Sequence, residues 1–353
     1  MKKRIISLLL CLTFIFAMAG CGAQGQDQGE NNEQKDTIKV GFAMKTLGGS
    51  YFVKLVENVE AACEELGWEC ISLNADRDIQ TEAANVDSLV AQGVDLIFLD
   101  CVDPEAAVSV VETALEAGIP TIAVDAGCAE DAPLLTSVYS NNEQNGRMVG
   151  LAYAAKMNGQ EIKAVMVSGS KGDVAGYERR LGLFCGIIEG MAGISEEDAW
   201  KAALDIEDQL VKTGKATNAD AHFTIVGQAW SGRTEDGGLE ASEDLIVANP
   251  DINCILGEND QMVFGAGLAV ENAGLEGVDL VAAADGEQRA YDLIKEGKYF
   301  ATGENSPALV AQLAMEVAQQ YLLEGKKDFD KVMFTDAVAI TEDNVDERYD
   351  YGF

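Results

Sequence analysis

The chain has 353 residues, of which 60 are acidic and 25 are basic, and its formal net charge is −35. Such an acidic surface repels phosphate groups, which excludes nucleic acids and anionic lipid headgroups as partners. The length is too great for one compact core and indicates two domains.

The first 20 residues have the pattern of a bacterial export signal. Basic residues at positions 2–4 precede an apolar run over 5–17 and the small residues before Cys21. That run is shorter than the roughly 20 residues of a membrane-spanning helix. Residues 21–36 are a predicted flexible tether, because after Cys21 they contain no apolar residue larger than alanine.

From residue 38 onward, a β-branched run, an amphipathic helix and a glycine follow one another repeatedly. Strands are predicted over 38–44, 68–73, 95–101, 121–125 and 134–140, and helices over 51–66, 79–92 and 104–117. Glycines at 67, 93 and 118 end these helices. Strand residues 96–99 are all apolar, as expected when helices cover both faces of a parallel sheet.

The pattern restarts after residue 140. Strands are predicted over 163–167, 223–226, 253–256, 278–283 and 331–340, and helices over 143–157, 177–190, 238–248, 261–273, 287–295 and 307–323. Residues 194–221 are predicted to be an irregular or helical insertion. The fold class is therefore α/β, with two doubly wound parallel-sheet domains instead of one continuous sheet.

Polar and aromatic residues follow the predicted strands directly. They occupy 45–52, 125, 230–233, 258–260, 285–286 and 304–305. Ligands of open parallel sheets bind beyond the carboxyl ends of the strands. Two such edges that face each other would form a binding cleft.

Most catalytic motifs are absent. No G-x-G-x-x-G follows the first strand, and no P-loop occurs. A serine triad needs a histidine, but the single histidine, His222, lies near the start of a predicted strand, far from the predicted cleft. No C-x-x-C pair occurs, and residues 74–78 lack the glycine and glutamate of a calcium loop. No cofactor or metal is expected. Asp125 and Asp285 could act as the two carboxylates of a glycosidase, or could accept hydrogen bonds from a bound polyol.

Six cysteines follow Cys21 in the sequence. They are Cys63, Cys70, Cys101, Cys128, Cys185 and Cys254. Most lie in apolar stretches, where a free cysteine is often a small buried hydrophobe. An exported protein could oxidise them, but their pairing does not follow from the sequence.

Several short segments, in this order and spacing, resemble the type I periplasmic binding proteins, specifically the ribose/galactose-like sugar-binding lipoproteins of ABC transporters. They are TLGGSYF (46–52), GVD (93–95), AGIPTIAVD (117–125), SNN (140–142), ERRLG (178–182), ANPDI (248–252), END (258–260) and ADG (284–286). The resemblance covers residues 37–340. It implies two domains, 37–140 with 306–331 and 141–305 with 332–353, joined by a hinge that the chain crosses near residues 141, 305–306 and 331.

The resemblance also implies a set of ligand-binding residues. These are Tyr51, Phe52, Asp125, Arg179, Asn259, Asp285 and Asn305, with Trp230 and Arg233 as candidates from a segment one residue longer than usual. Tyr51 and Phe52 would stack on a sugar ring, although core packing is the alternative for each.

One position departs from the family pattern. In many ribose-type members an arginine follows the first aspartate, whereas here Ala126 stands there. Lys45 is a candidate replacement cation. The ligand therefore stays open among a hexose, an acidic sugar and a non-sugar metabolite.

The implied function is that of a solute-binding protein, not an enzyme. It would capture a small sugar or polyol and deliver it to an ABC transporter permease, acting as a monomer. The resemblance to a lipobox implies lipidation of Cys21 and attachment to the outer face of the membrane, in a bacterium that lacks an outer membrane; an ordinary signal peptide is the alternative. For residues 37–353, the competing hypotheses are a sensory module for a membrane receptor and a glycoside-acting enzyme.

Overall fold

The computed structural model describes residues 37–353. The predicted export signal over 1–20, Cys21 and the predicted tether over 21–36 lie outside these residues. No helix in the described part of the chain has the length and apolarity needed to cross a membrane.

The first sheet has six strands in the order β12–β5–β4–β3–β1–β2, and all neighbours are parallel. Its strands are β1 (Lys39–Met44), β2 (Glu69–Asn74), β3 (Leu96–Asp100), β4 (Thr121–Val124), β5 (Thr136–Ser140) and β12 (Val332–Thr335). Its helices are α1 (Ser50–Leu66), α2 (Ile79–Ala91), α3 (Ala107–Glu116) and α10 (Pro307–Leu322). We call these elements the first lobe. The direction of winding reverses between β1 and β3, the place where such sheets bind ligands.

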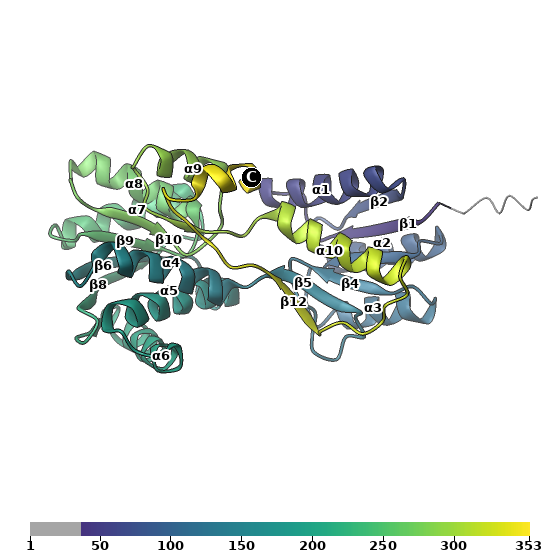
Figure 1. The fold of residues 1–353 in the computed structure, drawn as a ribbon, viewed down its shortest axis with the longest axis horizontal. Coiled ribbons are helices and arrows are strands. Elements are labelled where there is room, and N and C mark those ends of the chain that lie inside the picture. Colours follow the sequence, from purple (N-terminus) through teal and green to yellow (C-terminus); the bar gives the residue numbers. More distant parts are fainter. Residues whose placement is uncertain (1–36) are drawn as a thin grey trace, which may run out of the picture. The chain divides into compact units, whose positions relative to one another are not determined.

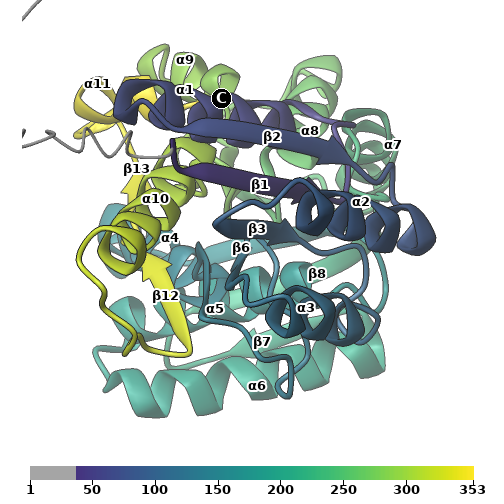
Figure 2. The ribbon, with the colours of Figure 1, turned by 90° about the vertical axis from the view of Figure 1, so that its right-hand side faces the viewer.

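Helices cover both faces of the first sheet. On one face, Phe42 and Phe98 pack edge to face and join the apolar sides of α1 and α10. On the other, Ile97 and Leu99 pack against α2 and α3. Figure 2 shows α10 on one side of β1 and β3, with α2 and α3 on the other. The alternating residues of one strand thus fill two cores, which explains why residues 96–99 of β3 are all apolar.

The second sheet has five strands in the order β10–β9–β6–β8–β7. Its strands are β6 (Ile162–Ser168), β7 (Ala216–Asn218), β8 (Phe223–Trp230), β9 (Cys254–Gly257) and β10 (Asp279–Ala282). Its helices are α4 (Asn142–Met157), α5 (Val174–Ala192), α6 (Glu196–Thr213), α7 (Glu235–Ala248), α8 (Asp260–Ala273), α9 (Gln288–Lys295) and α11 (Val345–Arg348), followed by a 3-10 turn over Tyr349–Tyr351. These elements form the second lobe. Its winding reverses between β6 and β9, so the central strands again mark the ligand-binding edge.

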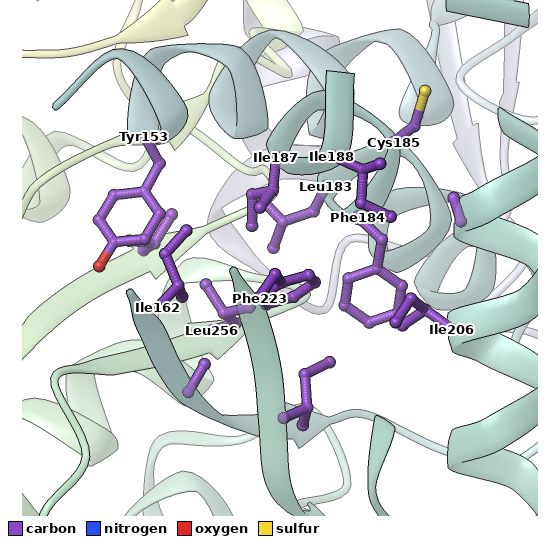
Figure 3. Packing of buried hydrophobic residues seen from close by; sticks show 14 of the residues in the cluster. Tyr153, Ile162, Leu183, Phe184, Cys185, Ile187, Ile188, Ile206, Phe223 and Leu256 are labelled. Atoms are coloured by element: carbon purple, nitrogen blue, oxygen red, sulfur yellow. The ribbon is translucent and has the colours of Figure 1, made fainter. Parts of the chain in front are cut away.

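The insertion predicted over 194–221 is ordered. Ser195 caps α6 by accepting a hydrogen bond from the Asp198 N–H, and β7 then adds an antiparallel edge to β8. Buried side chains of α6, among them Ile206, join the core in which Phe184 and Phe223 pack, as Figure 3 shows. The insertion therefore extends the second lobe's hydrophobic core.

Helices α4 and α5 cross at glycines. A Cβ at Gly182 would lie 2.0 Å from the Glu143 carbonyl oxygen, and one at Gly186 would lie 2.0 Å from the Arg147 carbonyl oxygen. No side chain fits there, so the two backbones pack directly against each other. This close packing holds the N-terminal part of α5, which carries Arg179, against the first turn of α4.

The chain passes between the two lobes three times. It leaves the first sheet after β5, returns with α10, and leaves again after β12, which lies beside β5 in Figure 1.

The prediction of a single strand over 331–340 is wrong. Strand β12 pairs with β5 of the first sheet, whereas β13 (Ala339–Ile340) pairs antiparallel with β11 (Thr302–Gly303). The last crossing therefore lies at 336–338 and not near Lys331, which places 332–335 with the first lobe. Both halves of the run are apolar enough for a strand, and only tertiary pairing separates them.

Candidate functional site

Lys45, which follows β1, connects two carboxylates of the first lobe. Its Nζ lies 2.9 Å from Asp100 Oδ1 and 2.9 Å from Asp125 Oδ2. Burial alone would lower the pKa of Lys45, but Asp125 and Asp100 together raise it above its usual range. Two carboxylates of the first lobe therefore surround the ammonium of Lys45, the candidate replacement cation.

Asp125 has an unusual backbone. Its φ is 68°, in the left-handed region that aspartate tolerates better than most side chains. Its N–H donates to the Val138 carbonyl, and the next N–H, of Ala126, donates back to the Val124 carbonyl. This tight turn at the end of β4 aims the carboxylate at Lys45, and such local strain is typical of functional positions.

Tyr51 and Phe52 form an aromatic pair beside these charges. Their ring centroids lie 5.5 Å apart at an interplanar angle of 79°, and Lys45 Nζ lies 4.9 Å from the Phe52 centroid. The Tyr51 hydroxyl is buried and has no hydrogen-bond partner among residues 37–353. Burial, followed by the charge of Asp125, raises the pKa of Tyr51, whereas Arg179 lowers it. The pKa of Tyr51 therefore depends on charged groups of both lobes.

Arg179 is the corresponding cation of the second lobe. It is 4% exposed, its Nη1 donates to Asp285 Oδ1 at 2.6 Å, and its Nε donates to Asn142 Oδ1 at 2.9 Å. Burial alone would lower the pKa of Arg179, but the charge of Asp285 raises it. The structure thus joins two predicted residues, Arg179 and Asp285, whose positions in the sequence are 106 residues apart.

A buried carboxylate supports the loop that carries Asp285. Asp260 Oδ2 accepts hydrogen bonds from the Gly286 and Glu287 N–H groups at 2.9 and 2.8 Å. Its Oδ1 accepts from the Tyr299 hydroxyl at 2.7 Å. Burial, with the charge of Asp285, raises the pKa of Asp260 to about 8. Burial likewise raises the pKa of Glu287 to about 7.

Two other predicted residues have mainly local roles. The Asn259 side chain accepts from the Met262 N–H and caps α8. The Asn305 N–H donates to the Asp285 carbonyl at 2.9 Å, so its backbone supports the Asp285 loop.

Trp230 and Arg233 interact with residues other than Arg179 and Asp285. Arg233 forms an ion pair with Asp173. Trp230 has the cations of Lys171 and Arg180 over its ring at 5.6 and 5.9 Å from the centroid. It lines a cavity of about 1030 Å³ bounded by α5 and α6.

Three further residues, which the sequence reasoning did not name as ligand-binding, contact or support the predicted ones. Asp100 is the last residue of β3, Asn142 is the first residue of α4, and Asp260 is the first of α8. The rule that ligands bind at strand ends would have found Asp100. No sequence signal identifies Asn142 as the partner of Arg179. Among residues 37–353, no group of three potential ligand side chains could hold a metal ion.

Comparisons with known proteins agree with this architecture. Residues 40–327 match a family model described as periplasmic binding protein domain. The ribose import binding protein of Bacillus subtilis is 28% identical over 327 residues, which cover 92% of this chain and 95% of that protein. The xylitol-binding protein of Mycolicibacterium smegmatis is 25% identical over 334 residues, covering 93% and 83%.

A solved structure supports the fold independently. The solute-binding protein of an ABC transporter from Actinobacillus succinogenes, crystallised with D-allose, has a TM-score of 0.70 at 24% identity, covering 88% of this chain and all of that one. At 24% identity, this similarity shows a shared fold.

Proposed function

The chain belongs to the family of periplasmic binding proteins, and we propose that it captures a small, neutral, polyhydroxylated solute between its two lobes, without chemical change. Its relatives include proteins named for import of ribose and of D-apiose, and for binding of xylitol. Sugars and polyols share one chemistry, a dense array of hydroxyl groups on a compact carbon frame. The likeness therefore supports this class of ligand without selecting one member.

The neutralised cations of the site are the observation that carries the proposal. Lys45 lies between two carboxylates, and Arg179 is paired with Asp285. An anionic ligand would find no free positive charge at these positions, and the carboxylates would repel it. Hydroxyl groups instead donate to carboxylate oxygens and accept from Arg179 and Lys45. This selects against the acidic sugar that the sequence left open.

Aromatic and unpartnered polar groups support the same class of ligand. The faces of Tyr51 and Phe52 suit the C–H face of a sugar ring, and the buried Tyr51 hydroxyl needs a partner that a bound hydroxyl would supply. A ligand that contacts Asp125 and Asp285 at once would favour a closed arrangement of the lobes, which is the proposed mechanism.

The enzyme alternative receives less support. A glycosidase needs one carboxyl group that holds a proton and a second that is free to attack or to activate water. Here Asp125 accepts from Lys45 and Asp285 accepts from Arg179, so both carboxylates are engaged by cations. These interactions suit acceptors of fixed direction better than a proton donor.

We further propose that the protein delivers its ligand to an ABC transporter permease. It would act as a monomer, held on the outer face of the cell membrane by lipidated Cys21. The anchor would keep the protein near its permease in a bacterium without an outer membrane. Replacing Cys21 by serine should release the protein into the medium and abolish its labelling by a palmitate analogue. Labelling that persists in the Cys21→Ser variant would contradict the anchor.

Calorimetry on the purified protein tests the ligand class. Ribose, allose, xylitol and myo-inositol represent neutral ligands, and galacturonate and ribose 5-phosphate represent anionic ones. We expect one-to-one binding of at least one neutral compound and no heat with either anion. Asp285→Ala should abolish that heat, whereas Asp279→Asn, at the opposite end of β10, should retain it. Binding confined to the anions, or turnover of the bound compound, would overturn the proposal.

A further inference from the structure

Two cysteines flank the carboxylates that hold Lys45. Cys101 directly follows Asp100 at the end of β3, and Cys128 lies three residues after Asp125, beyond the end of β4. Strands β3 and β4 are parallel neighbours, with Leu99 opposite Ala123. The topology therefore brings both cysteines to the same edge of the sheet as the candidate site.

The two cysteines belong to the same hydrophobic cluster, Cys101 within it and Cys128 packed against it. Cys101 Sγ donates to the Gly127 carbonyl at 3.5 Å, which places it against the residue preceding Cys128. The neighbouring Cys128 thiol, followed by burial, raises the pKa of the Cys101 thiol. Cys101 is buried, whereas Cys128 is half-buried and reachable from solvent. Cys128 is therefore the better nucleophile of the pair.

The cysteines of the second lobe provide a contrast. Cys185 and Cys254 are both buried, and their neighbours are the side chains of Arg147 and Tyr153, not a second thiol. In the first lobe, Cys63 and Cys70 likewise share one hydrophobic cluster, where the end of α1 meets β2. Close pairing of thiols is thus a property of the first lobe.

We propose that Cys101 and Cys128 form a disulfide that ties the ends of β3 and β4 together and fixes Asp100 and Asp125 around Lys45. The oxidant is an external disulfide of the extracytoplasmic space, where disulfides persist. The Cys128 thiolate attacks one sulfur of that disulfide and displaces a thiolate. Cys101 then loses its proton and attacks the Cys128 sulfur, displacing the second thiolate. Two cysteines are oxidised, and the external disulfide is reduced to two thiols.

The bond has a consequence for the site, and this part rests on the proposed function. The two carboxylates lie at the ends of separate strands, and Lys45 connects their side chains. A covalent link next to both would hold their spacing before the ligand arrives. Preorganisation of this kind raises affinity because less freedom is lost on binding.

Peptide mapping of the purified protein tests the bond. The reduced protein is incubated with oxidised glutathione, and remaining thiols are blocked by alkylation. Trypsin leaves both cysteines in one peptide, because no lysine or arginine lies between Arg77 and Arg147. A glutamyl endopeptidase separates them by cutting after Glu105 and Glu116. We expect a cross-linked pair of peptides that dithiothreitol separates, and a Tm several degrees higher in the oxidised form.

Matched variants make the outcome decisive. Cys128→Ser should lose the cross-link and the redox dependence of Tm, whereas Cys254→Ser should keep both. Alkylated Cys101 after oxidation, a stable glutathione adduct on Cys128, or a cross-link restricted to Cys63 and Cys70 would overturn the proposal.

Ligand binding separates the two parts of the inference. We expect the oxidised protein to bind its ligand roughly 3- to 10-fold more tightly than the reduced protein. Equal affinities would overturn the coupling to the site while leaving the disulfide intact. A disulfide that forms in a protein that binds no compound in either state would contradict the proposed function and not the bond.

Discussion

The ammonium of Lys45 lies 2.9 Å from the carboxylate of Asp100, which is buried at the end of the central strand β3. Burial, followed by the charge of Asp125, raises the pKa of Asp100 above its usual range. A buried carboxylate of this kind depends on its cation. Lys45 therefore supports the structure of the site as well as any contact with a ligand.

Lys45→Met should lower the free energy of unfolding by about 3–5 kcal/mol, because it leaves buried carboxylates without a partner. Urea denaturation of the ligand-free protein measures this. Lys54→Met is the matched control, since Lys54 pairs with Glu57 on the exposed face of α1 and should change stability by less than about 1 kcal/mol. Adding Asp100→Asn to Lys45→Met should restore part of the loss. Equal effects of the two lysine variants would contradict the buried ion pair.

Tyr51→Phe should separate stability from ligand binding. The hydroxyl is buried without a partner, so its removal should leave the ligand-free Tm unchanged or slightly higher. Affinity should fall about 10-fold, since one hydrogen bond to a ligand hydroxyl is lost. Tyr291→Phe removes a second unpartnered hydroxyl, in the second lobe beside Glu304, and should leave affinity unchanged. Unchanged affinity in both variants would place the Tyr51 hydroxyl outside the ligand contacts.

The buried Asp260 predicts a pH dependence of stability. Burial raises its pKa from 3.8 to about 8, so between these values the folded protein holds a proton that the unfolded chain has released. The free energy of unfolding should therefore fall as pH rises through this range, by up to about 1.4 kcal/mol per pH unit. Asp260→Asn should flatten this fall, as measured by urea denaturation at several pH values. An unchanged slope would show that Asp260 titrates in its ordinary range.

The crossing of α4 and α5 predicts a sharp steric effect. Gly186→Ala should destabilise the protein by more than about 2 kcal/mol, because the new methyl would overlap the Arg147 carbonyl oxygen. Gly267→Ala, within α8, meets only the tip of Leu280 at 3.1 Å and gains helix propensity, so it should be nearly neutral. Thermal unfolding compares the two. Similar Tm values for both variants would mean that α4 and α5 move apart at low cost.

Much of the fold could be predicted because its signals are local. Apolar runs such as residues 96–99 and glycines after helices recur along the chain, and they located most strands and helices within a few residues. The prediction of one strand over 331–340 failed because the segment is divided between two partners, β5 and β11, that are distant in sequence.

The candidate site shows the same division. The sequence by itself determined which residues follow the strands, among them Asp125 and Asp285, whereas Arg179 was expected only from the resemblance. Only the tertiary structure decided which groups meet: Lys45 with Asp100, Arg179 with Asp285, and the Cys101 thiol with the Gly127 carbonyl beside Cys128. The physical reason is the separation along the chain over which each kind of interaction acts. Hydrophobic period and turn chemistry act over a few residues, whereas a charge or a thiol acquires its partner, and so its protonation and reactivity, only when distant strands pack side by side.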